Sequence, residues 1–324
     1  MATFGDFPPN ANKDNSQSSS SWERKMIEDL AFAALKEQRN SRRWGYVFKG
    51  FILLYLIAAM ILMLPSGESA VSKMEHTALV EIQGVIAADA EANADTIVTG
   101  IRKAFESDTA KGLILRLNTP GGSPVQAGVI NDEIKRLRAT RPDFPVYAVI
   151  QDICASGGYY IAAAADEIYA DKASIVGSIG VRMDSFGFTG TMEKLGVERR
   201  LLTAGEHKGF LDPFLPVQQA DVDHVSLMLD NIHQQFIDVV KSGRGNKLSD
   251  DPKLFTGLVW SGEQALPLGL VDGLASSSHV ARDIIGAEDI IDYTPRPNYL
   301  DRFAGKLGAS LSQMMLQSTT LGVR

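Results

Sequence analysis

The stretch GLILRLNTPGGSPVQAGVI, residues 112–130, decides the fold. Its first six residues form a short, mostly apolar run that is typical of a strand in a parallel sheet, and a helical pattern begins after the Pro-Gly-Gly turn. The same order returns at PVYAVI, residues 145–150, which is followed by a Ser-Gly-Gly turn and a second helical segment. Strand, glycine turn and helix in this order predict parallel βαβ units and therefore an α/β fold.

The segments on either side continue this alternation. The predicted strands are Ala78–Ile86, Gly112–Leu117, Pro145–Ile150 and Glu167–Ala170. The predicted helices are Ala94–Ser107, Val125–Ala139, Gly157–Ala164, Ala220–Lys241 and Gly262–Leu268. No internal repeat of 20 to 50 residues is visible, so the sequence does not indicate a repeat architecture.

Composition describes a folded protein with unevenly distributed charge. Of 324 residues, 45% are hydrophobic and 22% charged, which excludes collagen, a fully disordered chain and a polytopic membrane protein. The net charge of -7 argues against a nucleic-acid binder. The single cysteine, Cys154, cannot form an internal disulfide, and no Cys/His cluster has metal-ligand spacing. We therefore expect no metal and no disulfide scaffold.

An apolar stretch with a single charged residue marks a predicted membrane span. Residues 44–64 read WGYVFKGFILLYLIAAMILML, and only Lys49 interrupts their apolar character. At about 1.5 Å per residue this segment covers the roughly 30 Å hydrocarbon core of a bilayer. A buried core helix would show a polar face, and a cleavable signal peptide fits poorly because the stretch begins more than forty residues into the chain.

The predicted span divides the chain into four parts. Residues 1–43 are expected to be a disordered tail and a short amphipathic helix, from Trp22 to Arg39, lying near the cytoplasmic leaflet. Residues 75–295 form the predicted globular domain, and residues 296–324 a C-terminal amphipathic helix that caps an oligomer, lies on the membrane or packs on its own domain. Basic residues gather before the span, so the positive-inside rule predicts a cytoplasmic N-terminus.

The two glycine turns carry the predicted chemistry. Each follows an apolar strand, and the carboxyl ends of strands are where open α/β sheets bind ligands. A serine at the start of a helix lies at the positive end of the helix dipole, and glycine allows a close approach to backbone N–H groups. We hypothesise that Ser156 attacks a carbonyl and that the N–H groups of Gly121, Gly122 or Gly157 receive the oxyanion.

Two other interpretations of these turns stay open at this point. Ser156 could simply be the N-cap of a helix. Either turn could bind phosphate, although neither is followed by a Gly-x-x-x-x-Gly-Lys-Ser/Thr motif. A nucleophilic serine also needs a base, and none of the five histidines lies where the pattern marks a triad member. A lysine can replace histidine where burial lowers its pKa, but eleven lysines follow the predicted span and the pattern does not choose among them.

Five motifs occur in a distinctive order along the globular part. They are Asn118-Thr-Pro-Gly-Gly, Ala155-Ser-Gly-Gly-Tyr-Tyr, Val176-Gly-Ser-Ile-Gly-Val, Ala204-Gly-Glu-His-Lys-Gly, and Val259-Trp-Ser-Gly-Glu-Gln-Ala with Gly269-Leu-Val-Asp. In this order they resemble the signal peptide peptidase A family of Ser-Lys serine proteases, over about residues 77–274. The resemblance implies one ClpP/crotonase-like domain, preceded here by a single transmembrane helix, and the length matches the half-length, membrane-anchored members of the family.

The resemblance also implies roles for individual residues. The family's nucleophile falls on Ser156 and its general base, in a Gly-x-x-Lys motif, on Lys208. Ser178 falls on a hydrogen-bond partner of that lysine. The oxyanion amides would come from Gly121, Gly122 and Gly157. His207 is a competing base beside Lys208, whereas Cys154 is expected to be a buried apolar residue and Trp260 to anchor a helix in the core.

By the same resemblance we expect a homo-oligomer, an octamer, whose active sites combine residues of neighbouring protomers. Ser156 and Lys208 should then lie too far apart in one chain for a hydrogen bond. The implied activity needs no cofactor and degrades cleaved signal peptides and other unfolded apolar peptides. It would act at the bacterial inner membrane, with the peptidase domain on the periplasmic side. The alternatives are a catalytically inactive scaffold and a crotonase-type acyl-thioester enzyme.

Overall fold

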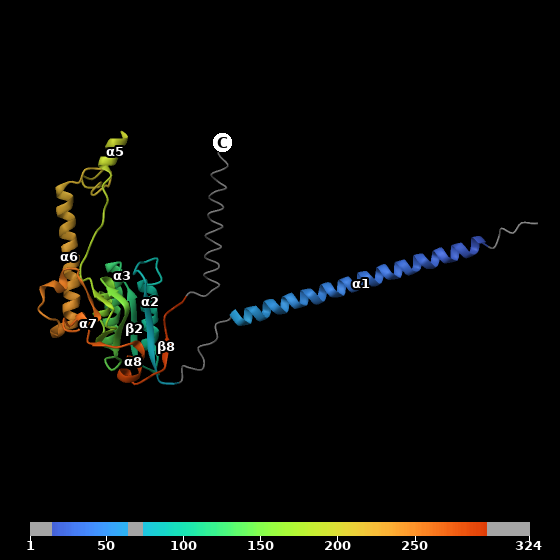
Figure 1. Ribbon diagram of the computed structural model, residues 1–324, viewed down its shortest axis with the longest axis horizontal. Helices are drawn as coiled ribbons and strands as arrows, with labels where there is room; N and C mark the ends of the chain where they lie inside the picture. Colours follow the sequence, from blue (N-terminus) through green and yellow to red (C-terminus); the bar gives the residue numbers. More distant parts are fainter. Residues whose placement is uncertain (1–14, 64–73, 297–324) are drawn as a thin grey trace, which may run out of the picture. The chain divides into compact units, whose positions relative to one another are not determined.

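The computed structural model describes residues 15–63 and 74–296 (Figure 1). The chain separates into two compact units, Met1–Val71 and Ser72–Arg324, which are described separately. The first 14 residues of the predicted tail and the predicted C-terminal amphipathic helix, apart from its first residue, lie outside the described residues.

The first unit contains the helix α1, Asn15–Met63, which runs without interruption. It begins inside the predicted tail and continues past Arg39, where we expected a separate amphipathic helix to end. No glycine or proline lies between Asn15 and Trp44, so the sequence contains no residue that would stop the helix there. Its stretch Arg42–Met60 is long and apolar enough to cross a membrane, and none of it is buried within the structure.

The second unit is built on an eight-stranded sheet. Its strands are β1 His76–Gln83, β2 Ala110–Thr119, β3 Val146–Ala155, β4 Glu167–Ala170, β5 Ile175–Gly177, β6 Val259–Ser261, β7 Gly273–Leu274 and β8 Ile290–Asp292. The main order is β6-β5-β3-β2-β1-β8, while β4 pairs with β3 and β7. All pairs are parallel except β5 with β6. This arrangement confirms the α/β class and fits a ClpP/crotonase-like domain.

Helices cover this sheet and extend beyond it (Figure 1). The α-helices of the second unit are α2 Ala94–Glu106, α3 Pro124–Thr140, α4 Gly157–Ala162, α5 Thr189–Leu195, α6 Gln219–Arg244, α7 Gly262–Ala265 and α8 Ser277–His279. Shorter turns are the 3₁₀ segments Gly245–Lys247 and Pro252–Phe255 and the π-helical segment Val280–Ile285. Helices α2 and α3 begin with side-chain caps, since Asn93 accepts the N–H of Thr96 and Ser123 that of Gln126.

The core has two layers because successive residues of a strand point to opposite faces of the sheet. On one face, Val80 and Leu115 belong to the large cluster that includes the apolar sides of α2, α3 and α4. On the other face, Leu79, Ile114 and Val149 pack against the π-helical segment. The central strands are therefore covered on both sides, which explains why their sequences are almost continuously apolar.

Strand β3 changes partner along its length. Its first half pairs with β4, and its last residues, Ile153–Ala155, pair with β5. An irregularity in the β2–β3 register, between Leu117 and Thr119, accompanies this change. The carboxyl end of β3 is thereby held directly between the ends of β2 and β5, and these are the three strand ends that carry the predicted site.

A segment between β5 and α6 extends away from the sheet, and we call residues 181–218 the arm. Every residue from 181 to 220 is described, and none of them is buried. In Figure 1, α5 and the chain that joins it to α6 lie at the end of α6 that is far from the sheet. The arm is held mainly by its own contacts, such as the stacking of Phe188 on Phe214 at 5.4 Å and the 3.1 Å ion pair between Arg199 and Asp212.

Candidate active site

Ser156 joins the end of β3 to the start of α4. Its φ of 52° and ψ of -121° are strained for a residue with a side chain, and its N–H donates to the carbonyl of Gly177 at 2.8 Å. The side chain makes no capping hydrogen bond. Ser156 thus occupies the N-cap position of α4, but its half-buried hydroxyl is not used to hold the helix.

The Pro-Gly-Gly turn packs directly against the Ser156 turn. Gly121 has a φ of 99°, and a Cβ atom there would lie 2.7 Å from the carbonyl oxygen of Ala155 and 2.8 Å from the Cβ of Ser156. A Cβ on Gly157 would lie 3.3 Å from the backbone nitrogen of Gly122. Only glycine fits at Gly121, because a side chain would meet both a strained φ and the neighbouring turn. The structure thus brings together the two turns that were predicted to form one site.

The backbone N–H groups of these turns are not equally free. The N–H of Gly121 donates to the hydroxyl oxygen of Thr119 at 3.1 Å. The N–H of Ser123 donates to the carbonyl of Ile86 at 2.8 Å. Among the described residues, no acceptor is found for the N–H groups of Gly122 and Gly157. Of the three predicted oxyanion donors, Gly121 is therefore already engaged, whereas Gly122 and Gly157 remain available.

Ser178 follows β5 and, like Ser156, has a positive φ. Its φ is 54°, and within the described residues only Ser156, Ser178 and Leu211 combine a side chain with a positive φ. The N–H of Ser178 donates to the carbonyl of Leu258 at 2.7 Å, so the β6 end of the chain holds this turn in place. Because Ala155 pairs with Gly177, the two strained serines follow adjacent strand ends.

Trp260 was predicted to anchor a helix in the core; it lies in β6, packs partly buried against the core and also supports the Ser178 turn. A Cβ on Gly177, where φ is 112°, would lie 2.8 Å from two carbon atoms of the Trp260 ring. The indole therefore packs on the one residue whose carbonyl binds the N–H of Ser156. Across the antiparallel pair of β5 and β6, Gly177 is opposite Val259 and Trp260 is opposite Val176, so the ring reaches Gly177 diagonally and no sequence pattern signalled this contact.

Gly177→Ala is expected to destabilise the protein by about 1–3 kcal/mol and to lower activity, because the methyl group would meet the Trp260 ring at a positive φ. Thermal unfolding monitored by circular dichroism checks the first effect. Gly128→Ala is the matched control, since nothing lies within 4 Å of a Cβ at this position inside α3. It should leave the melting temperature unchanged or raise it, and equal destabilisation by the two changes would contradict the role of this packing.

Lys208 lies in the arm, and its side chain is exposed in the single chain. The backbone N–H of Lys208 closes a turn by donating to the carbonyl of Gly205 at 3.1 Å. Within the described part of the chain no hydrogen bond joins Lys208 to Ser156 or Ser178, so the structure does not bring the predicted base to the predicted nucleophile. The neighbouring His207 pairs instead with Asp221 at 3.5 Å.

Other titratable groups near Ser156 are engaged or buried. Complete burial raises the pKa of the Cys154 thiol, which keeps it protonated, as expected for a small apolar residue. Burial likewise raises the pKa of Tyr159, whose hydroxyl donates to the carbonyl of Leu270 at 2.7 Å. His233 interacts with the carbonyl of Ile179 at 3.3 Å. None of these groups has a hydrogen bond to Ser156 in the described residues.

The last of the motifs, Gly269-Leu-Val-Asp, contributes to the stability of the fold. Asp272 accepts from the N–H of Ile168 and from the guanidinium of Arg244, both at 2.7 Å, and Lys247 pairs with its other oxygen. Arg244 is almost completely buried, so removing the Asp272 carboxylate would leave a buried guanidinium without its charge partner. This motif therefore connects α6 to the sheet. It lies far along the chain from the two glycine turns.

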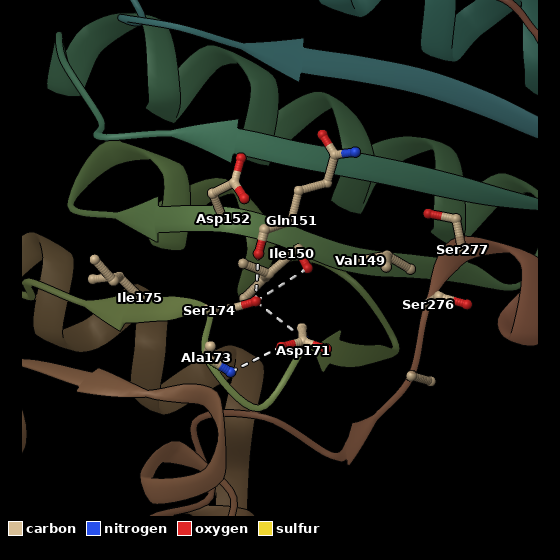
Figure 2. A pocket seen from close by; sticks show the side chains of 11 residues that line it. Val149, Ile150, Gln151, Asp152, Asp171, Ala173, Ser174, Ile175, Ser276 and Ser277 are labelled. Carbon is tan, nitrogen blue, oxygen red and sulfur yellow. Dashed lines mark hydrogen bonds between the residues drawn. The ribbon is translucent and has the colours of Figure 1, made fainter.

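A hollow of about 540 Å³ lies elsewhere on the sheet and contains none of the predicted site residues (Figure 2). It is formed by the middle of β3, the loop before β5 and the chain after β7. Its polar groups bind one another, since Ser174 accepts the N–H of Asp171 at 3.0 Å and donates to the carbonyl of Gln151. No group of metal-ligating side chains occurs among the residues that the structure describes.

Comparison with known proteins matches the chain to a protease family. The profile of peptidase family S49 matches residues 138–287, which include Ser156, Ser178 and Lys208. A putative protease of Synechocystis sp. is 30% identical over 208 residues, which are 63% of this chain and 72% of that protein. A putative signal peptide peptidase SppA of Enterococcus faecium is 28% identical over 223 residues, 66% of this chain and 64% of that protein.

Another relative is matched over only part of its own length. A Brucella abortus protein named Na(+)/H(+) antiporter NhaA is 46% identical over 186 residues, 57% of this chain but 25% of that protein. The chain thus spans about a quarter of this relative. The antiporter name describes the whole Brucella protein and is not carried over to this chain.

Proposed function

The chain belongs to peptidase family S49, the signal peptide peptidase A family, and on this premise we propose that it is a membrane-anchored serine endopeptidase with Ser156 as its nucleophile. The observation that carries the proposal is the strained Ser156, whose hydroxyl caps no helix and which lies against the Pro-Gly-Gly turn. Strained residues at the ends of parallel strands are typical of catalytic sites.

The open N–H groups define the proposed oxyanion hole. When the Ser156 oxygen adds to a peptide carbonyl, the carbonyl π electrons move to its oxygen, and the N–H groups of Gly122 and Gly157 donate to that oxygen. We assign Gly121 a supporting role, because its own N–H is taken by Thr119. Its conformation keeps the turn close to Ser156. Such preorganised donors stabilise the transition state more than the ground state.

Lys208 is proposed as the general base, with Ser178 as its hydrogen-bond partner. The neutral amine takes the proton of the Ser156 hydroxyl as the C–O bond forms, and the ammonium then returns it to the leaving amine when the peptide bond breaks. Water hydrolyses the resulting acyl-enzyme by the same transfers in reverse order. A lysine acts as a base only where its surroundings disfavour the charged form. The exposure of Lys208 in one chain therefore requires that another protomer cover it.

The arm supports an oligomer with shared sites. Its exposed apolar side chains are Met183, Phe186, Phe188, Leu195, Val197, Leu202, Phe210, Phe214 and Val217, and Leu202 is 97% exposed. Monomeric proteins rarely expose so many large apolar residues along one segment. Packing of the arm on a neighbouring protomer would bury them and bring Lys208 to that protomer's Ser156 and Ser178. A closed ring, for which we propose eight protomers, follows from repeated head-to-tail contacts of this kind.

The proposed location and substrates follow from the anchor. The span at Arg42–Met60 would hold the enzyme in the bacterial inner membrane, with the basic flank inside and the peptidase domain on the periplasmic side. Apolar segments partition to a bilayer interface, where an enzyme anchored in this way would meet them, and an extended chain would enter a closed ring more easily than a folded protein. Cleaved signal peptides and other unfolded apolar peptides combine these two properties. We propose these as substrates.

A fluorophosphonate probe tests the proposed chemistry on the full-length protein in detergent. The serine oxygen displaces fluoride from phosphorus, so the labelled peptide identified by mass spectrometry should contain Ser156 modified at its oxygen. Cleavage of an unfolded, casein-like protein should decrease as the labelled fraction of the enzyme increases. An inactive scaffold would neither label nor cleave, and a crotonase-type enzyme would turn over acyl thioesters without being labelled at Ser156; either outcome would overturn the proposal.

A further inference from the structure

Thr119 ends β2 and lies between the two glycine turns of the proposed site. It is completely buried, and its Cα pairs with that of Cys154 at the end of β3. Its hydroxyl oxygen accepts the N–H of Gly121 at 3.1 Å. Its methyl group lies 2.5 Å from the position that a Cβ on Gly158 would occupy, so this methyl fills the space left by that glycine. One side chain therefore contacts both turns.

With the hydrogen bond to Thr119, all but one of the backbone N–H groups in the Pro-Gly-Gly turn have an acceptor. Pro120 has no N–H, the N–H of Gly121 is bound to Thr119, and the N–H of Ser123 is bound to the carbonyl of Ile86. The carbonyl of Gly121 in turn accepts the N–H of Ile86 at 2.9 Å. Gly122 is thus left as the residue of this turn whose N–H has no acceptor among the described residues.

We propose that Thr119 is a positioning residue, which fixes the Pro-Gly-Gly turn so that the N–H of Gly122, beside that of Gly157, points to the developing oxyanion. This assignment rests on the proposed peptidase function and adds to it a residue that does not touch the substrate. The two parts of the side chain have separate tasks. The hydroxyl sets the orientation of the peptide unit between Pro120 and Gly121, and the methyl sets the distance between the turns.

Loss of the hydroxyl has a definite physical consequence. The N–H of Gly121 would be left buried without an acceptor, and a buried unsatisfied donor is costly enough to drive a local change. Rotation of the turn to satisfy it would move the N–H of Gly122 away from Gly157. The substrate could still bind, but the tetrahedral intermediate would lose a donor. We therefore expect a lower kcat with a nearly unchanged KM.

Three variants of Thr119 separate the effect of the hydroxyl from that of the methyl group. Thr119→Val keeps the shape and removes the hydroxyl, and Thr119→Ser keeps the hydroxyl and removes the methyl. Thr119→Ala removes both groups. The hydroxyl is therefore tested twice, by Val against Thr with the methyl group present and by Ala against Ser with the methyl group absent. This second pair keeps the test valid if the valine variant fails to fold. Gly128→Ala, in α3 and without neighbours within 4 Å of its Cβ, is the control for a change unrelated to the turn.

The full-length variants are compared for kcat and KM on a fluorogenic peptide, for inhibition by a peptide aldehyde, and for melting temperature. The aldehyde forms a hemiacetal with the serine oxygen, and its own oxygen occupies the oxyanion position. We expect Thr119→Val to lower kcat by about 10- to 100-fold and to weaken aldehyde inhibition by a similar factor, because one oxyanion donor is misplaced. Thr119→Ser should stay within about threefold of the wild type, since the acceptor is retained.

The possible results distinguish this assignment from the function on which it rests. If Thr119→Val, or Thr119→Ala where valine does not fold, is as active as Thr119→Ser while the wild type labels at Ser156, the positioning role is overturned and the peptidase function stands. A loss that follows the melting temperature and leaves aldehyde inhibition unchanged also overturns it. A wild-type protein that neither labels nor cleaves would overturn the proposed function, and this assignment with it.

Discussion

Ser156→Ala is expected to lower peptide hydrolysis by about 10⁴-fold or more, because without the serine oxygen no acyl-enzyme can form. Initial rates on an unfolded protein substrate and on a fluorogenic peptide measure the loss. The variant should bind peptide as before, since the oxyanion N–H groups and the neighbouring turn are unchanged. Its melting temperature should stay close to that of the wild type, because the hydroxyl makes no capping bond that the fold would lose.

Cys154→Ala is the matched control for this result. Cys154 lies near the end of β3, two residues before Ser156, and it carries the other side chain with nucleophilic chemistry in this segment. It is completely buried, and burial raises the pKa of its thiol, so it is neither accessible nor ionised. The alanine variant should keep most of the activity. A folded Cys154→Ala variant without activity, or a Ser156→Ala variant that keeps more than about a hundredth of the rate, would show that the nucleophile is misassigned.

The sequence predicted strands β1 to β4, and the central ones were detectable because they are buried on both faces of the sheet. It did not predict β5 to β8, each of which has only two or three residues. The predicted strand Glu167–Ala170 coincides with β4, and the helices predicted at Ala94–Ser107 and Val125–Ala139 differ from α2 and α3 by one residue at each end at most. The central strands are longer than predicted, since β3 continues through Gln151 and Asp152 to Ala155. Two exposed polar residues interrupt the apolar pattern there, and the register of the sheet is irregular at the same place; pairing continues at Ile153 with β5 and at Cys154 with β2.

The site was predicted in part, and the missing part has a physical reason. Glycine turns after apolar strands pointed to Ser156, Gly121 and Gly122, and the structure places these turns in contact. The choice between the three oxyanion N–H groups could not be predicted, because it depends on the hydrogen bond from Gly121 to Thr119. That bond is a matter of local geometry, for which a threonine before Pro-Gly-Gly is at most a weak signal.

The general base, unlike the nucleophile, was not indicated by any sequence pattern. The choice of Lys208 came from a resemblance, and no pattern of apolar residues around it indicates a pocket within one chain. The structure likewise has no such pocket around Lys208 within one chain, because none of the described residues 181–220 is buried. A segment that leaves its apolar side chains exposed carries information about a partner surface, and a single sequence read for its own core cannot supply that surface.

Lys208→Ala is expected to be as inactive as Ser156→Ala when each variant is purified alone, yet a mixture of the two should regain activity. If each site combines Ser156 of one protomer with Lys208 of its neighbour, co-expression in equal amounts makes about a quarter of the sites complete in a head-to-tail ring. Sites built within one chain would regain nothing, because every chain lacks one of the two groups. The rates of co-expressed, tandem-purified proteins on the fluorogenic peptide decide between these arrangements.

Two controls make this complementation specific. The double variant Ser156→Ala/Lys208→Ala, co-expressed with either single variant, should remain inactive, because no pairing of its chains restores a site. His207→Gln should keep most of the wild-type rate, since His207 pairs with Asp221 in the arm and has no proposed part in proton transfer. An inactive mixture of associated protomers would contradict the shared site. Full activity of Lys208→Ala alone would instead remove Lys208 as the base, and loss of activity in His207→Gln with Lys208 intact would favour the histidine. The mixture therefore tests the arm, the base and the assembly in one measurement, because each of them must be right for two inactive chains to make an active enzyme.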